Sequence, residues 1–199
     1  MASGEACRRR IRTGAPSWKS AAQAKLPFPS LMSYDLAQVV LPTLEREWPV
    51  IRAELDALDL DADFVPWPQR DGYAGNWSVF PLYFPGESYI PGVDVARHRA
   101  KCPRSAALLD GLPRLVAAGF SLVGPQSHIF KHTDMYAPNL LRCHLGVRVP
   151  PGVTMWVKGE PVVWQEGRCV VFSGSDEHEV INSGTQPRVV LLADFSVDD

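Results

Sequence analysis

The feature that most constrains the fold of this chain is a series of short β-rich runs in its C-terminal half. Between residues 120 and 195, stretches rich in Val, Leu, Ile, Phe and Thr alternate with turn residues such as Gly, Pro, Asn and Asp. We predict strands at 120–123, 140–149, 154–157, 167–172, 178–182 and 188–195. Several short strands at this spacing are typical of a β-sandwich or barrel.

The first half of the chain carries two helical patterns. In the first pattern, apolar residues recur at spacings of three and four, at Leu44, Trp48, Ile51, Leu55 and Leu58. Residues 106–118 repeat the theme, and the Pro- and Gly-rich stretch between the two patterns predicts ordered loops with one strand at Trp77–Tyr83. We therefore expect helix-and-loop support over residues 33–118 and a β core over 119–196.

Composition and charge bound the function. The chain has 199 residues, 46% of them hydrophobic and 21% charged, which is typical of a globular domain, and we expect one domain over residues 31–199. Residues 1–30 hold six Lys/Arg and one acid, including Arg8, Arg9 and Arg10, and predict a flexible basic tail. The net charge is −2, so the rest of the chain is acidic on balance and predicts no nucleic-acid partner.

Hydropathy and cysteine spacing favour a cytoplasmic protein. No run of about 18 apolar residues is present, so we expect no membrane partner. The four cysteines are far apart and form no CxxC pair, which argues against a zinc ribbon or a disulfide framework. Reduced thiols in a cytoplasm are the simplest interpretation.

The run 141–149 predicts a strand with one apolar and one polar face. Because side chains alternate along a strand, Arg142, His144, Gly146 and Arg148 share one face. Any half-exposed strand shows this pattern, but Ser121 and Arg188 also bring polar groups into apolar runs. If the helices cover the apolar face, these polar groups point into the barrel, where a buried arginine needs an anion.

Three residues in this half of the chain have the character of metal ligands. His132 and Asp134 stand two residues apart, and His178 follows 46 residues after His132 at the start of a predicted strand. Two histidines and one carboxylate leave three positions open on an ion, which suits iron(II) with a bidentate co-substrate and oxygen. An HxD pair alone occurs by chance in many chains. Arg188, ten residues after His178, adds a planar fork that can pair both oxygens of a carboxylate.

A larger set of motifs resembles the aspartyl/asparaginyl β-hydroxylase family, over roughly residues 48–194. The likeness rests on Phe120-Ser121-Leu122, His132, the run 141–147, Trp164-Gln165-Glu166-Gly167, Glu177-His178-Glu179-Val180, Asn182 and Arg188, with Phe64, Pro66-Trp67-Pro68, the run 77–83 and Cys102-Pro103 upstream.

The resemblance implies a fold and a chemistry. The fold would be mainly β with flanking helices, a jelly-roll or cupin-like double-stranded β-helix with the N-terminal helices packed on one sheet. The activity would be hydroxylation of a C–H bond with iron(II), 2-oxoglutarate and molecular oxygen, releasing succinate and carbon dioxide.

The family's residue roles carry over position by position. His132 and His178 would bind iron, and with Asp134 of the HxD pair, as in bacterial relatives, they would form the catalytic centre. Ser121 and Arg188 would hold the distal carboxylate of 2-oxoglutarate, and Arg142 with His144 would line its other end. Animal members have glycine in place of Asp134, and they carry a substrate-binding arginine where this chain has Leu140.

The substrate is open at this stage. A small molecule or peptide is expected, first the β-carbon of an aspartyl- or asparaginyl-like residue, with another small molecule or an acyl chain as alternatives. A different class of function is a cupin-like module that binds a metal or a small molecule without turnover. That alternative needs no Arg142, His144 and Arg188 around a dicarboxylate, so it explains fewer residues.

Overall fold

The computed structural model describes residues 36–84, 90–134 and 139–197 of the chain. The basic tail predicted for residues 1–30 lies outside the described residues. The helical elements are a π-helical turn η2 (Leu36–Val40), α1 (Leu41–Asp56), a 3-10 turn η3 (Arg70–Gly72), α2 (Val95–Lys101) and α3 (Pro103–Asp110). None of the described helices combines the length and the apolar character that a membrane-spanning helix requires.

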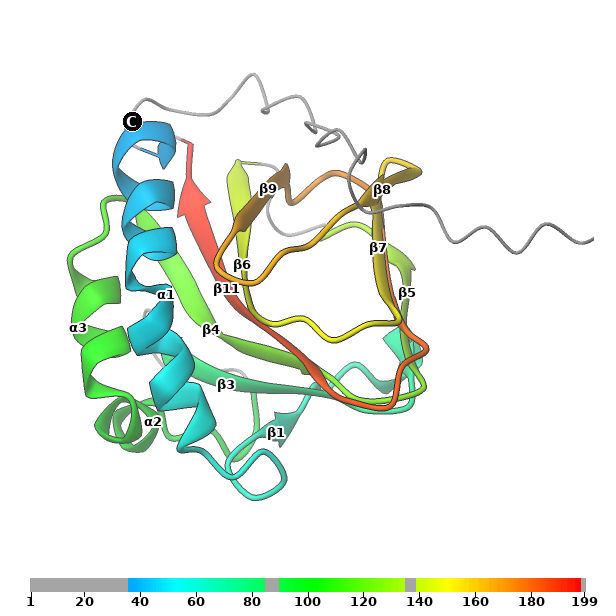
Figure 1. Cartoon of the computed structure of the whole chain (residues 1–199), viewed down its shortest axis with the longest axis horizontal. Helices are drawn as coiled ribbons and strands as arrows, with labels where there is room; N and C mark the ends of the chain where they lie inside the picture. The colour runs from blue at the N-terminus through cyan, green and yellow to red at the C-terminus, as the bar shows by residue number, and fades with distance from the viewer. Residues whose placement is uncertain (1–35, 85–89, 135–138, 198–199) are drawn as a thin grey trace, which may run out of the picture.

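Two antiparallel sheets face each other and form the barrel (Figure 1). The six-stranded sheet runs in the order β1 (Val65–Pro66), β3 (Trp77–Tyr83), β4 (Leu115–Val123), β11 (Arg188–Ser196), β6 (Leu140–Arg148) and β9 (Cys169–Ser173). The five-stranded sheet runs in the order β2 (Tyr73–Ala74), β5 (Ser127–His132), β10 (His178–Asn182), β7 (Val153–Val157) and β8 (Glu160–Val162). The predicted double-stranded β-helix with flanking helices is confirmed.

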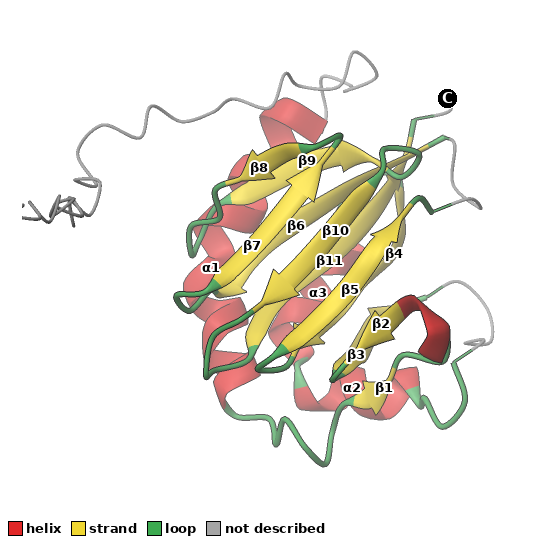
Figure 2. Ribbon diagram, turned by 90° about the vertical axis from the view of Figure 1, so that its right-hand side faces the viewer, coloured by secondary structure: helices red, strands yellow, loops and turns green. Residues whose placement is uncertain are grey.

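The helices cover the outer face of the six-stranded sheet and leave the five-stranded sheet uncovered, as Figure 2 shows with the helices behind the strands. Helix α1 lays one stripe on this face because Leu44, Ile51 and Leu55 follow the helical repeat, and each is 0% exposed. Burial of such a side chain stabilises the fold by about 1.5–3 kcal/mol. The helix layer therefore supplies a core that does not involve the barrel interior.

Strand β6 separates this core from the barrel interior. Leu141, Cys143 and Leu145 are buried in the core under the helices, as the alternation predicts. Arg142 and His144 lie on the opposite face, where Arg142 pairs with Asp134 beyond the end of β5 and the His144 ring lies 5.2 Å from that of Phe172. The prediction is wrong only for Arg148. The register between β6 and β11 shifts between Val189 and Val190, and Arg148 instead pairs with Asp56 of α1 at 2.6 Å.

The predicted helix over residues 106–118 is wrong in its second half. Helix α3 ends at Asp110, and Leu115 already pairs with Phe195 of β11. Gly111 and Pro113 break the helix, and the apolar residues that follow gain more from pairing in the sheet than from their helical propensity.

Two elements of the structure were not predicted from the sequence, β5 and α2. Strand β5 was not expected as a full strand, because its polar residues obscure the alternation that places Ser127 and Ile129 inside. Helix α2 begins at the cap Asp94, whose side chain accepts from the backbone N–H of Arg97 at 3.0 Å. On it, His98 is 6% exposed and stacks on Phe80 with ring centroids 4.0 Å apart.

Gly119 allows β3 and β4 to approach closely at the inner wall of the barrel. A Cβ at this position would lie 2.6 Å from the carbonyl oxygen of Phe80. We expect Gly119→Ala to lower the free energy of unfolding by about 1–3 kcal/mol, as overpacking does. Gly72→Ala is the matched control, because a Cβ there meets nothing within 4 Å. Urea denaturation of both variants measures the difference, and equal midpoints would contradict the expectation.

Candidate active site

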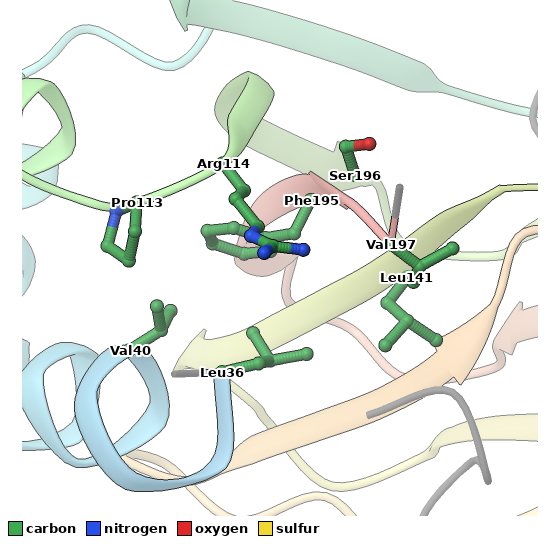
Figure 3. A pocket seen from close by; sticks show the side chains of 8 residues that line it. All are labelled: Leu36, Val40, Pro113, Arg114, Leu141, Phe195, Ser196 and Val197. Carbon is green, nitrogen blue, oxygen red and sulfur yellow. The ribbon is translucent and has the colours of Figure 1, made fainter. Parts of the chain in front are cut away.

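The described part of the chain contains hollows of very different size. One lies where η2 meets the end of β11, among Leu36, Val40, Leu141 and Phe195 (Figure 3). Its volume of about 10 Å³ suits no more than about one water molecule. A second cavity, of about 870 Å³, lies within the size range of small-molecule sites.

The large cavity follows the inner face of β3 and β4 and reaches two of the predicted metal ligands. Its described wall is mainly apolar and includes Trp67, Trp77, Val79, Pro81, Tyr83, Ile90, Ala117, Gly119, Leu140 and Leu192. His132, Asp134 and Arg142 line the same cavity. The apolar surface and the polar cluster therefore share one space.

The structure brings His132, Asp134 and His178 together. One ligand atom from each lies within 4.8 Å of the others. The two histidines face each other because β5 and β10 are antiparallel and pair His132 with His178 in register. The Nε2 atom of His178 lies 3.7 Å from Asp134 Oδ2, and Nε2 of His132 lies 4.0 Å from Asp134 Oδ1.

Backbone carbonyls orient both imidazole rings. Nδ1 of His132 donates to the carbonyl oxygen of Phe130 at 2.6 Å, and Nδ1 of His178 donates to that of Asp176 at 2.8 Å. A carbonyl oxygen only accepts, so a neutral ring keeps its free lone pair on Nε2, toward Asp134. Burial lowers the pKa of His178, which favours the neutral ring that a metal ion needs.

Arg142 links Asp134 to a second carboxylate. Its Nε and Nη2 pair with the two oxygens of Asp194 at 2.8 Å each, and its Nη1 donates to Asp134 Oδ2 at 2.5 Å. Burial alone would lower the pKa of Arg142, but the two carboxylates together raise it. The guanidinium is thus charged and already engaged on both sides.

Arg188 is buried in a different way. Its side chain is 1% exposed, and its guanidinium lies 3.8 Å from the ring centroid of Trp164. Within the described residues, no carboxylate is recorded as its partner, and burial lowers the pKa of this group. Its Nε has no hydrogen-bond partner. A guanidinium held on an aromatic face keeps donors and charge available for an anion.

Two more donors without partners adjoin Arg188. His144 Nδ1 accepts from Arg188 Nη2 at 3.4 Å, so a neutral His144 carries its proton on Nε2. Burial, and then the charge of Arg188, lower the pKa of His144 and keep the ring neutral. His144 Nε2 and Trp164 Nε1 are buried without a partner. This cluster contains donors that lack an acceptor.

Ser121 is not joined to Arg188 in this structure. Its Oγ accepts from Trp77 Nε1 at 3.2 Å, and its partner position on β11 is Val190. Trp77 in turn stacks on Trp67 with ring centroids 4.8 Å apart and lies 6.5 Å from the His132 ring. Ser121 therefore lines the cavity near the histidine cluster, within an aromatic wall.

Two features of the site were not predicted from the sequence: the role of Asp194 and the contact of the Trp164 ring with Arg188. A signal for Asp194 was present, because it interrupts an apolar strand and lies six residues after Arg188, on the same face. Trp164 belongs to the motif set, but no pattern in the sequence pairs it with Arg188, because it lies in the loop that follows β8 and only the closed barrel brings its ring to the guanidinium.

Comparison with known proteins identifies a family whose members resemble this chain. The family described as Aspartyl/Asparaginyl beta-hydroxylase matches residues 45–197. Aspartate beta-hydroxylase domain-containing protein 2 of Mus musculus is 32% identical over 181 residues, which cover 85% of this chain and 51% of the relative. The chain spans about half the length of such curated relatives.

Two further similarities are more specific in their names. Ornithine lipid ester-linked acyl 2-hydroxylase of Rhizobium tropici is 32% identical over 163 residues, covering 76% of this chain and 55% of the relative. A solved prolyl-4-hydroxylase of Pseudomonas putida aligns with a TM-score of 0.49 at 20% identity, over 78% of this chain and 87% of that one.

The three-residue cluster leads to a prediction about metal binding. We expect His132→Ala and His178→Ala each to lose more affinity for manganese(II) than the roughly 10- to 100-fold typical of residues that only support a ligand. Asp134→Gly tests whether the carboxylate contributes. His128→Ala is the control, since His128 pairs with Glu179 at 3.2 Å outside the cluster. Calorimetric titration measures all four, and wild-type affinity in either histidine variant would contradict the assignment.

Proposed function

Because the chain belongs to the aspartyl/asparaginyl β-hydroxylase family, we propose that this hydroxylase uses iron(II), 2-oxoglutarate and molecular oxygen. The observation that carries the proposal is the meeting of two histidines and one carboxylate within 4.8 Å at the wall of a large cavity. Two neutral nitrogens and one carboxylate form the ligand set typical of non-haem iron oxygenases.

The cluster around Arg188 fits the co-substrate. Arg188 Nε, His144 Nε2 and Trp164 Nε1 are buried donors without acceptors. A buried arginine without a counter-ion is several kcal/mol out of balance, and a carboxylate would restore that balance. This supports Arg188 as the partner of the far carboxylate of 2-oxoglutarate, with His144 donating nearby. The role of Ser121 at this carboxylate stays a prediction, because its hydroxyl accepts from Trp77 in this structure.

Different groups of residues have different roles in the proposed reaction. When bound, iron with 2-oxoglutarate and oxygen supplies the oxidation of a C–H bond, and succinate and carbon dioxide are released. His132, Asp134 and His178 would hold the ion through Nε2, a carboxylate oxygen and Nε2. The apolar wall of the cavity orients the substrate and excludes water.

The residues that line the cavity indicate the class of substrate. Arg142 is the only Lys or Arg among the described lining residues, and two carboxylates already engage it. Leu140 lines the wall where animal members carry an arginine for the substrate carboxylate. We therefore propose that the substrate presents an uncharged aliphatic group, such as an acyl chain, to the iron. The aspartyl-like substrate stays a prediction with less support.

The Rhizobium tropici relative, whose name describes acyl hydroxylation, agrees with this substrate class. The competing function, binding without turnover, is separated by one assay. Purified protein is incubated with iron(II), ascorbate and 2-oxoglutarate, and succinate is measured. Slow iron-dependent succinate formation supports an oxygenase, and its absence in a protein that still binds both ligands supports a binding module.

The first prediction of this function concerns Arg188. Truncation of one partner of a desolvated ion pair typically costs about 2–5 kcal/mol, so Arg188→Ala should raise the KM for 2-oxoglutarate at least tenfold. The KM of Arg188→Lys should lie between those of the wild type and Arg188→Ala, because a lysine keeps the charge but cannot form the bidentate fork. Manganese(II) affinity should stay near wild type in both. Normal 2-oxoglutarate dependence of Arg188→Ala would require another residue for the carboxylate.

The second prediction concerns the apolar cavity. The phenyl ring of Ala117→Phe would fill part of the cavity that Ala117 lines. Fatty-acyl amide and ester probes should then no longer gain one oxygen, which mass spectrometry measures. Succinate formation without substrate should remain, since Ala117 is not among the groups assigned to iron or 2-oxoglutarate. Ala107→Phe on the exposed side of α3 is the control. If aspartyl peptides gain oxygen and the acyl probes do not, the aliphatic class is wrong.

A further inference from the structure

Asp194 holds Arg142 against the candidate metal ligands. The two residues are directly paired in register on β11 and β6. Both oxygens of Asp194 accept from one edge of the guanidinium, and this bidentate geometry fixes the plane of the Arg142 side chain. Asp194 is 7% exposed, and the partner recorded for its side chain is Arg142. It does not belong to the three-residue ligand cluster.

The free edge of Arg142 reaches one oxygen of Asp134. Nη1 donates to Oδ2, which lies 3.7 Å from His178 Nε2, while Oδ1 lies 4.0 Å from His132 Nε2. The hydrogen bond therefore engages one of the two carboxylate oxygens and leaves Oδ1 without this donor. Asp134 lies two residues beyond the end of β5, and this contact also restricts how its side chain points.

We propose that Asp194 is a positioning residue, which acts through Arg142 to make Asp134 an effective metal ligand. With Asp194 present, the three charged groups carry one net negative charge beside two neutral imidazoles, which suits a dication. Without Asp194, the whole positive charge of Arg142 is directed at Asp134 and competes with the metal ion for the carboxylate. Asp194 thus offsets the charge of Arg142 and fixes its direction.

This inference rests on the proposed function, so the test measures metal binding rather than turnover. Apo protein is titrated with manganese(II) in the absence of 2-oxoglutarate. We expect Asp194→Asn to weaken binding by about 10- to 100-fold, the range for residues that support a metal ligand. In an Arg142→Gln background, the same substitution should change the affinity by no more than about twofold, the usual error of additivity.

The control removes a comparable carboxylate far from the cavity. Asp56 pairs with Arg52 at 2.8 Å and with Arg148 at 2.6 Å, and Asp56→Asn should leave manganese(II) affinity unchanged. Circular dichroism checks that every variant is folded. If Asp194→Asn does not fold, Asp194→Ser takes its place in both backgrounds, and a loss of affinity with Arg142 present that falls to within about twofold without it supports the relay.

Three outcomes would overturn the inference. Wild-type affinity in Asp194→Asn removes any role of Asp194 in the metal site. An equal loss in the presence and absence of Arg142 shows that Asp194 acts on the metal ion directly rather than through the arginine. If wild-type protein itself binds no manganese(II), the proposed metal site fails and this inference fails with it; failure in Asp194→Asn alone leaves the proposed function intact.

Discussion

The structure depends on how the barrel interior accommodates two arginines, Arg188, which is buried, and Arg142, which is partly buried. A guanidinium taken out of water is costly unless it is paired or stacked. The chain meets this constraint in two ways: Arg142 lies between Asp134 and Asp194, and Arg188 lies on the face of Trp164. The first arrangement neutralises the charge and leaves little for a ligand. The second leaves the charge available for an anion. The same residue type therefore has two different functions in one barrel.

These polar groups are tolerated because the main core lies elsewhere. The helices pack on the outer face of the six-stranded sheet, and the buried residues of α1 meet the apolar side of β6. Stability thus comes largely from a layer that the ligands never enter. A second, smaller apolar cluster fills the space between the sheets around Phe172, Met155 and Val180. Phe172 also contacts the rings of His144 and His178, with centroids 5.2 and 4.9 Å away, so this cluster packs directly against the site.

Much of the fold follows from the sequence because alternation and spacing are local properties. Strands β3 and β10 were predicted at their observed bounds, and the division of β6 into an apolar and a polar face was correct up to the bulge before Arg148. Residues 115–118 were misassigned because their Ala and Leu content favours a helix and only pairing with β11 makes them a strand. The same limit applies to the site. His132 and His178 were recognisable as residue types, whereas the pairing of Asp194 with Arg142 depends on which strands become neighbours.

The register of His132 opposite His178 has a consequence for how the protein matures. Forty-five residues separate the two histidines along the chain, and the strands that carry them meet only when β5 and β10 pair. Closing so long a loop is entropically unfavourable until the barrel forms around it, so the ligand set is assembled late in folding. Arg142 and Asp194 likewise meet only when β6 and β11, which are far apart in the sequence, pair in the sheet. A nascent or partly unfolded chain therefore lacks the preformed site, and under the proposed function its capacity for oxidative chemistry would arise only together with the fold that contains the site.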